Sequence, residues 1–590
     1  MDTKTKSTKW RLTDLYAGVN DPAIATSLNE ADALIKTLDM YRGKITNLTS
    51  SDLHQLITTW EQLSRIFHRI DLFASLLEST NIGVNEITRF RKKIDEQIID
   101  RAKQTIFIQV ELAQIPRDRW QEYLKADILS PYKHFIREQY EASKHVLSEP
   151  EEKILADKSQ TSWQALTHLF EITTDTLECD WNGKTITLEE LLTQFHSSDA
   201  STRQQAAIVL HKSLAKNDQT TPAIFNSLLQ DKAMTDRLRQ YEFPEQSRFM
   251  SDNVDKPTVL AMATAVEQSY SLVTRYYNLK KKILKTDTLH WYDRYAPLPE
   301  TKAEINAEEA KTMVEHAYGD FSPEMAEIVR QMYEKEHIDW FPGKTKRGGA
   351  FCAFGDTDLY PYVLLNHTNS PRDVMTLAHE LGHAIHDVLA AQKNVFLEIH
   401  PSLALAEIAS VFGETLLFEK LIGDPNISKD DKTTLLMAHI EGTFATVFRQ
   451  TTMFRFEQAV HELRRKEGEL SKDEIDNLWH ETMKAPFKAA LTYTDEHKNT
   501  WMYVNHIFEM PFYVYSYAFA QLCVLALYKQ YKEQGNAFVP AYLDILRAGG
   551  SLTPKESLAI VGLDISRPDF WEDGLSVIGE FITRLEQAID

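Results

Sequence analysis

Two histidines and a glutamate within five residues form the segment with the clearest chemical potential in the sequence. His379 and His383 are four residues apart in Asp373–Leu389, a mostly apolar stretch with helical spacing, so both imidazoles lie on one face of a helix. Two imidazoles placed in this way can bind one metal ion. Glu380 points about 100° further around the helix and can contact a metal-activated water without binding the metal. The pattern predicts hydrolysis with Glu380 as the general base.

The same five residues can also arise by chance in a helix that has only a structural role. The apolar surroundings make this alternative weaker, because three buried polar groups need partners. A catalytic zinc ion further requires a third protein ligand and an open position for water. The three cysteines are too widely spaced to supply it as a Cys-rich module. Histidine and carboxylate must therefore hold the metal.

Three glutamates after the motif are candidates for the third ligand: Glu398, Glu407 and Glu414. Glu407 lies in the apolar helical run Leu403–Phe418, where an unpaired carboxylate would be costly, so we choose it. Glu414 lies on the same face two turns later and can orient a ligand histidine, although a solvated helix face is an equal alternative. His386 shares the face of the motif histidines, and we expect it to be a hydrogen-bonded neighbour, since a fourth ligand would close the site.

The ligand set predicts one Zn²⁺ ion per chain. Imidazole and carboxylate ligands also suit cobalt and manganese, so metal availability decides which ion is bound. The formal charge of −21 over 590 residues argues against a nucleic-acid partner, because phosphate binding needs a basic surface. Met1–Trp10 lacks the apolar region of a secretory signal, and the longest apolar stretches are too short to cross a membrane. We therefore expect a cytoplasmic protein without membrane contact.

Helical spacing dominates the chain and predicts a mainly α fold. It is clear in Leu53–Leu77, in Glu86–Ile115, and in almost everything after Pro371 up to a final helix at Trp571–Ile589. At 590 residues the chain is too long for one simple core. We predict an N-terminal helical lobe over residues 1–200 and a catalytic domain over residues 201–590.

A few segments have the composition of strands. Cys179–Thr187 contains Asn-Gly, the strongest two-residue turn signal, and predicts a small hairpin. Thr288–Pro299 and Tyr360–His367 are aromatic and extended, and between them the glycine-rich loop Gly343–Gly355 runs into a short strand. We expect a small β-sheet here, just before the metal motif.

Taken together, these residues resemble the thimet oligopeptidase family of zinc peptidases, in particular its oligoendopeptidase F branch. The form H-E-x-G-H-x-x-H at His379–His386 goes beyond the general zinc motif, and Glu398–Glu407 resembles the family segment whose glutamate ligand maps onto Glu407. Further similar segments are Lys346–Phe351, His506 with Tyr513, Tyr515 and Tyr517, Ala548–Ser551, Gly562–Asp564 and Phe570–Trp571. The similarity covers most of the chain and is weakest in the first 200 residues.

The resemblance implies a mainly α, two-lobed fold with the zinc ion at the floor of a deep channel and a small β-sheet near the active site. Short unstructured peptides would enter this channel, whereas folded proteins would be excluded. Gly349, Ala350 and Phe351 would place a strand edge beside the substrate, where backbone pairing tolerates many sequences. From the sequence alone, the same glycines can equally mark a mobile loop.

The family also uses a histidine and a tyrosine to donate hydrogen bonds to the oxyanion, and these map onto His506 and Tyr513. Met510–Phe512 replaces a glycine-rich loop of the mammalian members, so Tyr515 and Tyr517 remain rivals, and we expect both to contact the substrate. Alternatively, these tyrosines begin an aromatic helix packed in the core. We expect that environment for at least one of them.

The sequence thus predicts a zinc endopeptidase that hydrolyses short oligopeptides by a metal-activated water. One alternative is a peptidyl-dipeptidase of the same fold, which needs a cation to bind the terminal carboxylate of its substrate. The other is a non-catalytic helical protein that binds peptides. Glu380 and Glu407 argue against this binder, because binding alone does not require a general base.

Overall fold

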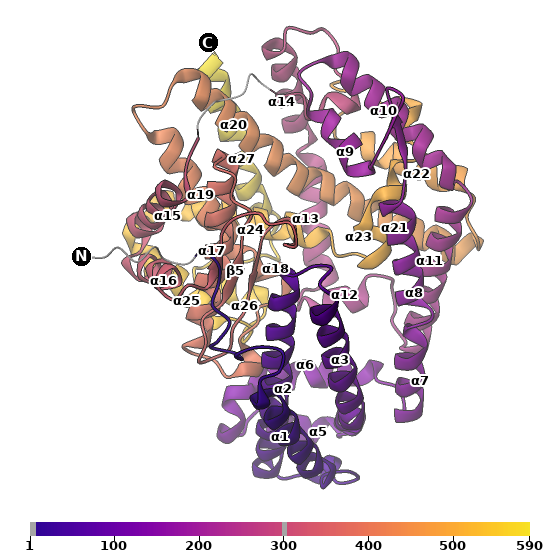
Figure 1. Cartoon of the computed structure of the whole chain (residues 1–590), viewed down its shortest axis with the longest axis vertical. Coiled ribbons are helices and arrows are strands. Elements are labelled where there is room, and N and C mark those ends of the chain that lie inside the picture. The colour runs from indigo at the N-terminus through magenta and orange to yellow at the C-terminus, as the bar shows by residue number, and fades with distance from the viewer. Residues whose placement is uncertain (1–7, 298–303, 590) are drawn as a thin grey trace. The chain divides into compact units, whose positions relative to one another are not determined.

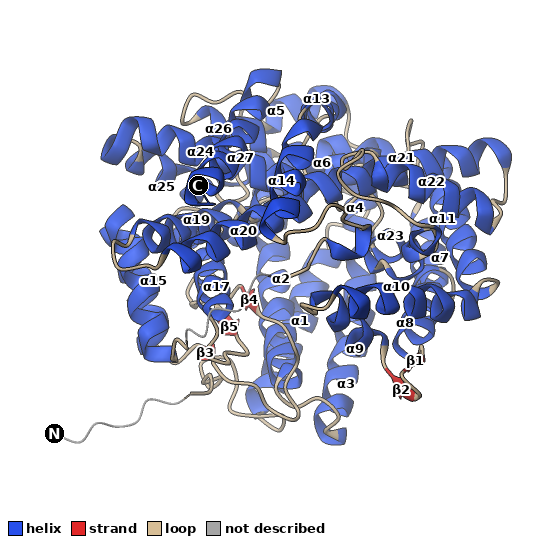
Figure 2. Ribbon diagram, turned by 90° about the horizontal axis from the view of Figure 1, so that it is seen from above, coloured by secondary structure: helices blue, strands red, loops and turns tan. Residues whose placement is uncertain are grey.

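The computed structural model describes residues 8–297 and 304–589, so residues 1–7 of the N-terminal stretch Met1–Trp10 lie outside it. Most of the described residues are helical, and the strands are few and short (Figure 1, Figure 2). The predicted mainly α fold with a small β-sheet is confirmed. No helix in this described part is both long and apolar enough to cross a membrane.

The chain divides into two compact units, and each unit is built from three separate segments. The first unit comprises Met1–Lys153, Ala303–Leu421 and Gln530–Leu563. The second unit comprises Ile154–Lys302, Ile422–Lys529 and Asp564–Asp590. Residue 200 lies inside a segment of the second unit, and the division into residues 1–200 and 201–590 stays a prediction.

The first unit contains most of the N-terminal helices, the three-stranded sheet and the helix with the metal motif. Its elements are α1 (Pro22–Asp39), α2 (Ser50–Ser79), α3 (Asn85–Ala102), α4 (Ile106–Leu112), α5 (Arg117–Tyr123), α6 (Lys133–Ala142), α15 (Ala307–Phe321), α16 (Pro323–Glu334), β3 (Ile338–Asp339), β4 (Phe351–Ala353), β5 (Tyr362–Leu364), α17 (Pro371–Ala391), α18 (Leu403–Ala406), most of α19 (Ile408–Gly423), α25 (Val539–Ala548) and α26 (Pro554–Ala559).

The second unit is helical apart from one hairpin. Its elements are most of α7 (Glu149–Ser159), α8 (Trp163–Asp175), β1 (Cys179–Trp181), β2 (Lys184–Ile186), α9 (Leu188–Thr193), α10 (Ala200–Leu214), α11 (Thr220–Leu238), α12 (Gln246–Ser251), α13 (Lys256–Gln268), α14 (Tyr270–Ile283), α20 (Lys429–Phe444), α21 (Gln450–Glu467), α22 (Lys472–Lys484), α23 (Asn505–Glu509), most of α24 (Tyr515–Gln534) and α27 (Pro568–Ile589).

The small sheet of the first unit has the order β3-β5-β4, so β4 is an edge strand. β5 runs parallel to β3 and antiparallel to β4, where Cys352 is opposite Val363. Tyr362 and Leu364 of the buried central strand pack in one hydrophobic cluster with Leu72 and Leu76 of α2. This packing anchors the sheet to the longest helix of the N-terminal segment.

The predicted hairpin is confirmed, whereas the predicted small sheet lacks one of the segments expected in it. β1 and β2 pair antiparallel around Asn182 and Gly183, which both have positive φ as a type I′ turn requires. The prediction that Thr288–Pro299 joins the small sheet is wrong for its described residues. Residues 288–297 contain the 3-10 turn Trp291–Asp293, which buries its aromatic rings, and residues 298 and 299 lie outside the described part.

Helix α17 carries the metal motif, and its start follows from local sequence signals. Ser370 and Asp373 form a reciprocal capping box, and Pro371 occupies the first turn, where its missing N–H costs nothing. The helix packs against α15, α16, α25, β4 and β5. Because neighbours surround it within the first unit, the direction of each motif side chain is fixed.

Candidate functional site

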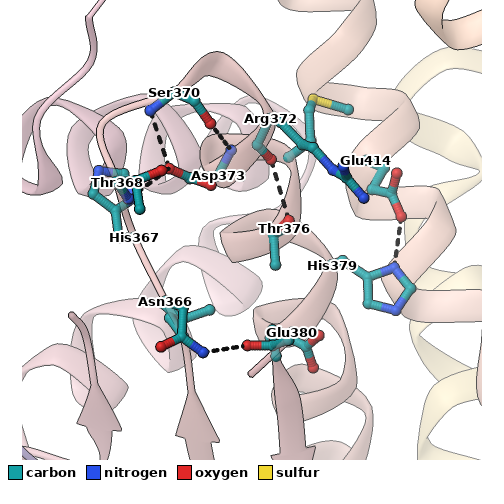
Figure 3. Close-up of a pocket in the computed structure, with 14 residues that line it drawn as sticks. Asn366, His367, Thr368, Ser370, Arg372, Asp373, Thr376, His379, Glu380 and Glu414 are labelled. Carbon is teal, nitrogen blue, oxygen red and sulfur yellow. Dashed lines mark hydrogen bonds and ion pairs between the residues drawn. The ribbon is translucent and has the colours of Figure 1, made fainter. Parts of the chain in front are cut away.

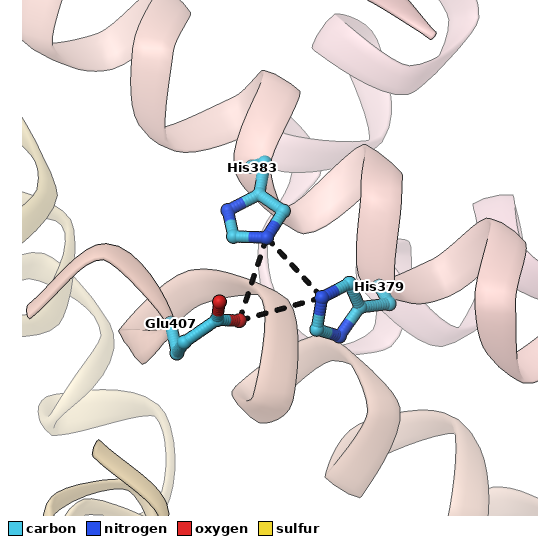
Figure 4. A group of neighbouring side chains, drawn as sticks. All are labelled: His379, His383 and Glu407. Carbon is cyan, nitrogen blue, oxygen red and sulfur yellow. Dashed lines mark hydrogen bonds and ion pairs between the residues drawn. The ribbon is translucent and has the colours of Figure 1, made fainter. Parts of the chain in front are cut away.

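His379, His383 and Glu407 converge on one point in the first unit (Figure 4). The Nε2 atoms of the two histidines are 3.2 Å apart. The Oε2 atom of Glu407 lies 3.3 Å from Nε2 of His379 and 3.4 Å from Nε2 of His383. Among the described residues, this is the group of three whose donor atoms come close enough together for one metal ion.

The spacing of these three atoms fits a zinc ion. Ligand atoms about 2.1 Å from one ion, arranged tetrahedrally, are about 3.4 Å apart. The three separations in the structure, 3.2, 3.3 and 3.4 Å, match this value. Two imidazoles and one carboxylate also form a donor set typical of catalytic zinc, which leaves a fourth position open.

Glu407 reaches the cluster because the chain bends at this residue. The predicted continuous helix Leu403–Phe418 is interrupted here, since α18 ends at Ala406 and α19 begins at Ile408. The Ser410 hydroxyl donates to Oε2 of Glu407 at 2.7 Å and fixes the carboxylate. Burial alone would raise the pKa of Glu407, but His383 and His379 outweigh it and lower this pKa to about 2. The group is therefore ionised, as a metal ligand must be.

Glu414 orients one of the histidines. Nδ1 of His379 donates to Oε1 of Glu414 at 2.5 Å, as the sequence suggested. A proton on Nδ1 leaves Nε2 with a free lone pair toward the cluster. Burial acts to lower the pKa of His379, but the Glu414 and Glu407 carboxylates raise it to about 9. The carboxylates thus create a site that favours positive charge.

Gly382 lets helix α17 approach closely to the start of α19, directly after the ligand Glu407. A Cβ atom at this position would lie 2.4 Å from Cα of Ser410 and 2.6 Å from the Ala409 oxygen. Gly413 of α19 has a similar role, because its missing side chain accommodates the Tyr318 ring. The Tyr318 hydroxyl then donates to the Ala378 oxygen at 2.7 Å. These contacts explain why a glycine stands between the motif histidines.

Glu380 is buried beside the cluster and is not one of its three members. Burial raises its pKa, an effect that His379 and His383 partly offset. A carboxylate with a raised pKa is a better proton acceptor at neutral pH. His386 lies one turn after His383 and is also outside the cluster, and burial lowers its pKa to about 3. The roles of both residues stay predictions.

Two cavities of the first unit meet at the cluster. The first cavity, of about 690 Å³, is lined by the loop before β4 with Gly349, by the start of α17 and by Glu414 of α19. Arg372 of α17 and Glu414 are labelled in Figure 3. The second cavity, of about 640 Å³, is lined by β4 and by the segment between α17 and α19. Ala350, His379 and Glu380 line both cavities. An extended chain that occupies both would therefore pass the cluster.

The loop before β4 is fastened to its surroundings by polar contacts. The Lys346 ammonium donates to Oδ1 of Asp339 at 2.6 Å and to the backbone oxygens of Phe341 and Leu365. Asn366 donates from Nδ2 to the oxygen of Gly349 at 2.7 Å. Gly349 itself has φ +76°, which side-chain-bearing residues rarely adopt. Gly349, Ala350 and Phe351 each line at least one of the two cavities, and their role toward the substrate stays a prediction.

With this geometry established, comparison with known proteins identifies the family. The family model described as peptidase family M3 matches residues 193–577, and one described as oligopeptidase F matches residues 111–178. The chain belongs to peptidase family M3. It shares 26% identity with Oligopeptidase PepF of Bacillus subtilis, over 98% of this chain and 87% of the relative. An Oligoendopeptidase F homolog of Borreliella burgdorferi is also 26% identical, over 98% and 97% of the two chains.

Solved structures show the same M3 fold. A protein of Chlamydophila abortus superposes with a TM-score of 0.86 at 24% identity, over 98% of each chain. Oligoendopeptidase-F from Enterococcus faecium gives a TM-score of 0.72 at 20% identity, over 96% of this chain and 99% of that one. Membership in the family makes this M3 chain a peptidase, and the resemblance seen in its sequence is confirmed.

The predicted oxyanion donors of the M3 chain lie in the second unit, whereas the cluster lies in the first. His506 is within hydrogen-bonding distance of the Tyr517 hydroxyl, 3.1 Å from Nε2. The rings of His506 and Tyr513 are parallel with centroids 6.2 Å apart, and Tyr513 contacts Tyr517 edge-on at 5.0 Å. The three residues therefore form one group, and their role toward the substrate stays a prediction.

Tyr515 has a different environment from the other tyrosines. Its side chain is fully buried, and its hydroxyl donates to Oδ2 of Asp252 at 2.7 Å. This is the core environment expected for at least one of the tyrosines. To bind a substrate, Tyr515 would have to leave the interior and break this hydrogen bond.

The structure also places residues that the sequence analysis assigned differently or did not consider. Glu398, considered as a ligand, instead accepts a hydrogen bond from the Phe135 N–H at 2.8 Å, and burial raises its pKa to about 7. Arg372 precedes His379 by seven residues, two helical turns, so the helical period could have placed it at the site. Ser410 and His68 gave no such signal, because tertiary packing alone brings them there.

Proposed function

We propose that the chain is a zinc-dependent endopeptidase that hydrolyses short oligopeptides. The observation that carries this proposal is the tetrahedral spacing of three donor atoms beside the buried carboxylate of Glu380, at the junction of two cavities. The family supports peptide hydrolysis, and the donor set supports zinc over harder cations such as magnesium, which prefer oxygen ligands. Cobalt or manganese would fit the same ligands.

Nε2 of His379, Nε2 of His383 and Oε2 of Glu407 would hold the ion. Glu414 and Ser410 would keep a ligand histidine and the ligand glutamate in their binding orientations. When bound, zinc polarises the scissile carbonyl and makes water acidic enough to attack near neutral pH. The remaining chemistry belongs to the residues of the chain.

Glu380 would act as the general base and then as the general acid. Its carboxylate takes a proton from the attacking water and passes it to the leaving amine. Burial supports this role, since it raises the pKa of Glu380 toward the pH at which the enzyme works. The edge strand β4 would pair with the peptide backbone through the segment Gly349–Phe351.

His506 and Tyr513 would donate hydrogen bonds to the oxyanion that forms on the scissile carbonyl, with Tyr517 as the alternative donor. Burial lowers the pKa of His506 and so favours its neutral form, which retains one N–H donor. Donors of this kind contribute about 3–4 kcal/mol to transition-state stabilisation. Loss of the Tyr513 or Tyr517 hydroxyl in Tyr→Phe variants would identify the donor by a fall in kcat.

The variant Glu380→Gln tests the proposal. We expect it to keep the fold and bind zinc, and to lose cleavage of an internally quenched peptide. Zinc content measured by elemental analysis separates loss of the base from loss of the metal. Cleavage at the wild-type rate by the zinc-loaded variant would refute the mechanism. A wild-type protein that binds peptides but leaves them uncut would instead support the non-catalytic alternative.

Arg372 favours a second candidate, a peptidyl-dipeptidase. Its guanidinium group lines the first cavity and extends toward Glu414 and His379 in Figure 3. Within residues 8–297 and 304–589, no hydrogen bond or ion pair engages it. Such a cation could bind the terminal carboxylate of a substrate. Mass spectrometry of products from free and C-terminally amidated peptides decides: an endopeptidase cuts both, whereas a peptidyl-dipeptidase needs the free carboxylate.

A further inference from the structure

We propose that the second cavity is a specificity pocket for a large apolar or aromatic side chain of the substrate. This inference rests on the proposed peptidase function and adds the class of peptide that the site prefers. The pocket would take the side chain of one of the two residues that flank the scissile bond. Four observations support it: the aromatic rings that line the cavity, the contacts that hold these rings, the charged side chains in the lining, and the position of the cavity beside the metal-site residues.

Three aromatic rings from separate segments form part of the wall of the cavity. His68 of α2, Phe354 after β4 and His400 before α18 line this wall. The Phe354 and His400 rings are 4.7 Å apart at 83°, and the His68 and Phe354 rings are 5.7 Å apart. Aromatic side chains pack favourably against such edges and faces.

The aromatic wall is rigid before any substrate binds. Nε2 of His68 donates to the backbone oxygen of Gly355 at 2.8 Å, which fixes the orientation of the imidazole. Phe396 packs behind the wall, with ring centroids 5.5 Å from His68 and 6.4 Å from Phe354. Phe354 and Phe396 belong to one buried hydrophobic cluster. A preformed wall loses little conformational entropy when a side chain binds.

The described lining of this cavity lacks a fixed positive side chain that could pair with an acidic residue of the substrate. No lysine or arginine is among its described lining residues, whereas Glu380, Asp387 and Glu407 are. Burial lowers the pKa of His400 to about 4, so this ring is neutral at physiological pH. In contrast, Arg372 lines the first cavity. The two cavities thus differ in the side chains they would accept.

Leu403 exposes an apolar surface to this cavity. It is 37% exposed, and it lies four residues before Glu407. His379, Glu380 and Glu407 line the same cavity. A substrate side chain bound in it would therefore belong to a residue next to the scissile bond. Burying the exposed leucine against the substrate would contribute to binding through the hydrophobic effect.

The test compares quenched peptides that differ in one residue beside the cut, with phenylalanine, leucine, alanine, lysine or glutamate at that position. We expect kcat/KM for phenylalanine to exceed that for glutamate by about 10- to 100-fold at one flanking position. Mass spectrometry assigns that position. Leu403→Arg should lower kcat/KM for phenylalanine and raise it for glutamate, and Leu403→Ala should lower the former by a smaller factor.

Ile560→Arg is the matched control, because Ile560 is 38% exposed and does not line the cavity. It should leave the ratio of phenylalanine to glutamate unchanged. Equal rates for all five peptides, or a preference for lysine through Asp387, would overturn the inference while leaving the peptidase proposal intact. If no peptide is cut, binding of the phenylalanine and glutamate peptides to Glu380→Gln still tests it, and equal dissociation constants would refute it.

Discussion

Replacement of Gly382 by alanine tests the idea that close contact between α17 and α19 builds the metal site. The new Cβ would lie 2.4 Å from Cα of Ser410, and ordinary contact begins at 3.4 Å. The start of α19 must therefore move by about 1 Å (3.4 − 2.4), and overpacking of this kind costs about 1–3 kcal/mol. Alanine regains about 1 kcal/mol of helix propensity. The net loss of stability is about 0–2 kcal/mol.

The shift also reaches the ligands. Ser410 holds Oε2 of Glu407, and a movement of about 1 Å exceeds the tolerance of about 0.2 Å for ligand distances. We therefore expect zinc affinity to fall about 10- to 100-fold, as it does when supporting contacts of metal ligands are lost. Chelator competition measures this affinity, and thermal unfolding of the metal-free protein measures the stability loss separately.

Gly442→Ala provides the control for this experiment. Gly442 lies within α20, and beyond its neighbours along the chain and the backbone of its own helix no described atom lies within 4 Å of the position of an added Cβ. Alanine there should stabilise the protein by up to about 1 kcal/mol and leave zinc affinity unchanged. If Gly382→Ala were as stable as Gly442→Ala and bound zinc as tightly as the wild type, the packing argument would be refuted.

Three further predictions concern the supporting residues. Glu414→Ala should lower zinc affinity by about 10- to 100-fold in chelator competition, because His379 loses the acceptor of its Nδ1 proton; unchanged affinity would contradict this role. Lys346→Met should raise KM for peptides more than it changes kcat in steady-state kinetics, because the loop with Gly349 loses its anchor; an unchanged KM would show that the loop holds without it. Burial raises the pKa of Glu457 from a usual 4.5 to about 8, and the hydrogen bond from the Phe512 N–H offsets only part of this effect. Between these two pH values the folded protein keeps a proton on Glu457 that the unfolded chain releases. The folded state therefore loses stability as the pH rises from 4.5 to 8. Glu457→Gln should thus unfold at a higher temperature than the wild type at pH 8 and at nearly the same temperature at pH 5, and parallel pH profiles of the two proteins would contradict the assignment.

The sequence by itself determined the features that depend on local backbone geometry. The helical period places His379 and His383 on one face and Glu380 beside them, whatever surrounds the helix. Capping signals at Ser370 and the Asn-Gly turn at residues 182 and 183 act over two to four residues, so they too could be predicted. The mainly α fold follows from the same periodic pattern along most of the chain.

Only the tertiary structure decided which distant residues join the site. The sequence offered Glu398, Glu407 and Glu414 as candidate ligands and favoured Glu407, and packing separates the positions of the three carboxylates. The break before α19 brings Glu407 to the cluster, whereas Glu398 turns to the Phe135 N–H. The aromatic wall likewise combines α2 with segments some 300 residues later in the chain, among them His68 and His400. Such contacts arise from the burial of hydrophobic faces, which is non-directional and leaves no fixed spacing in the sequence.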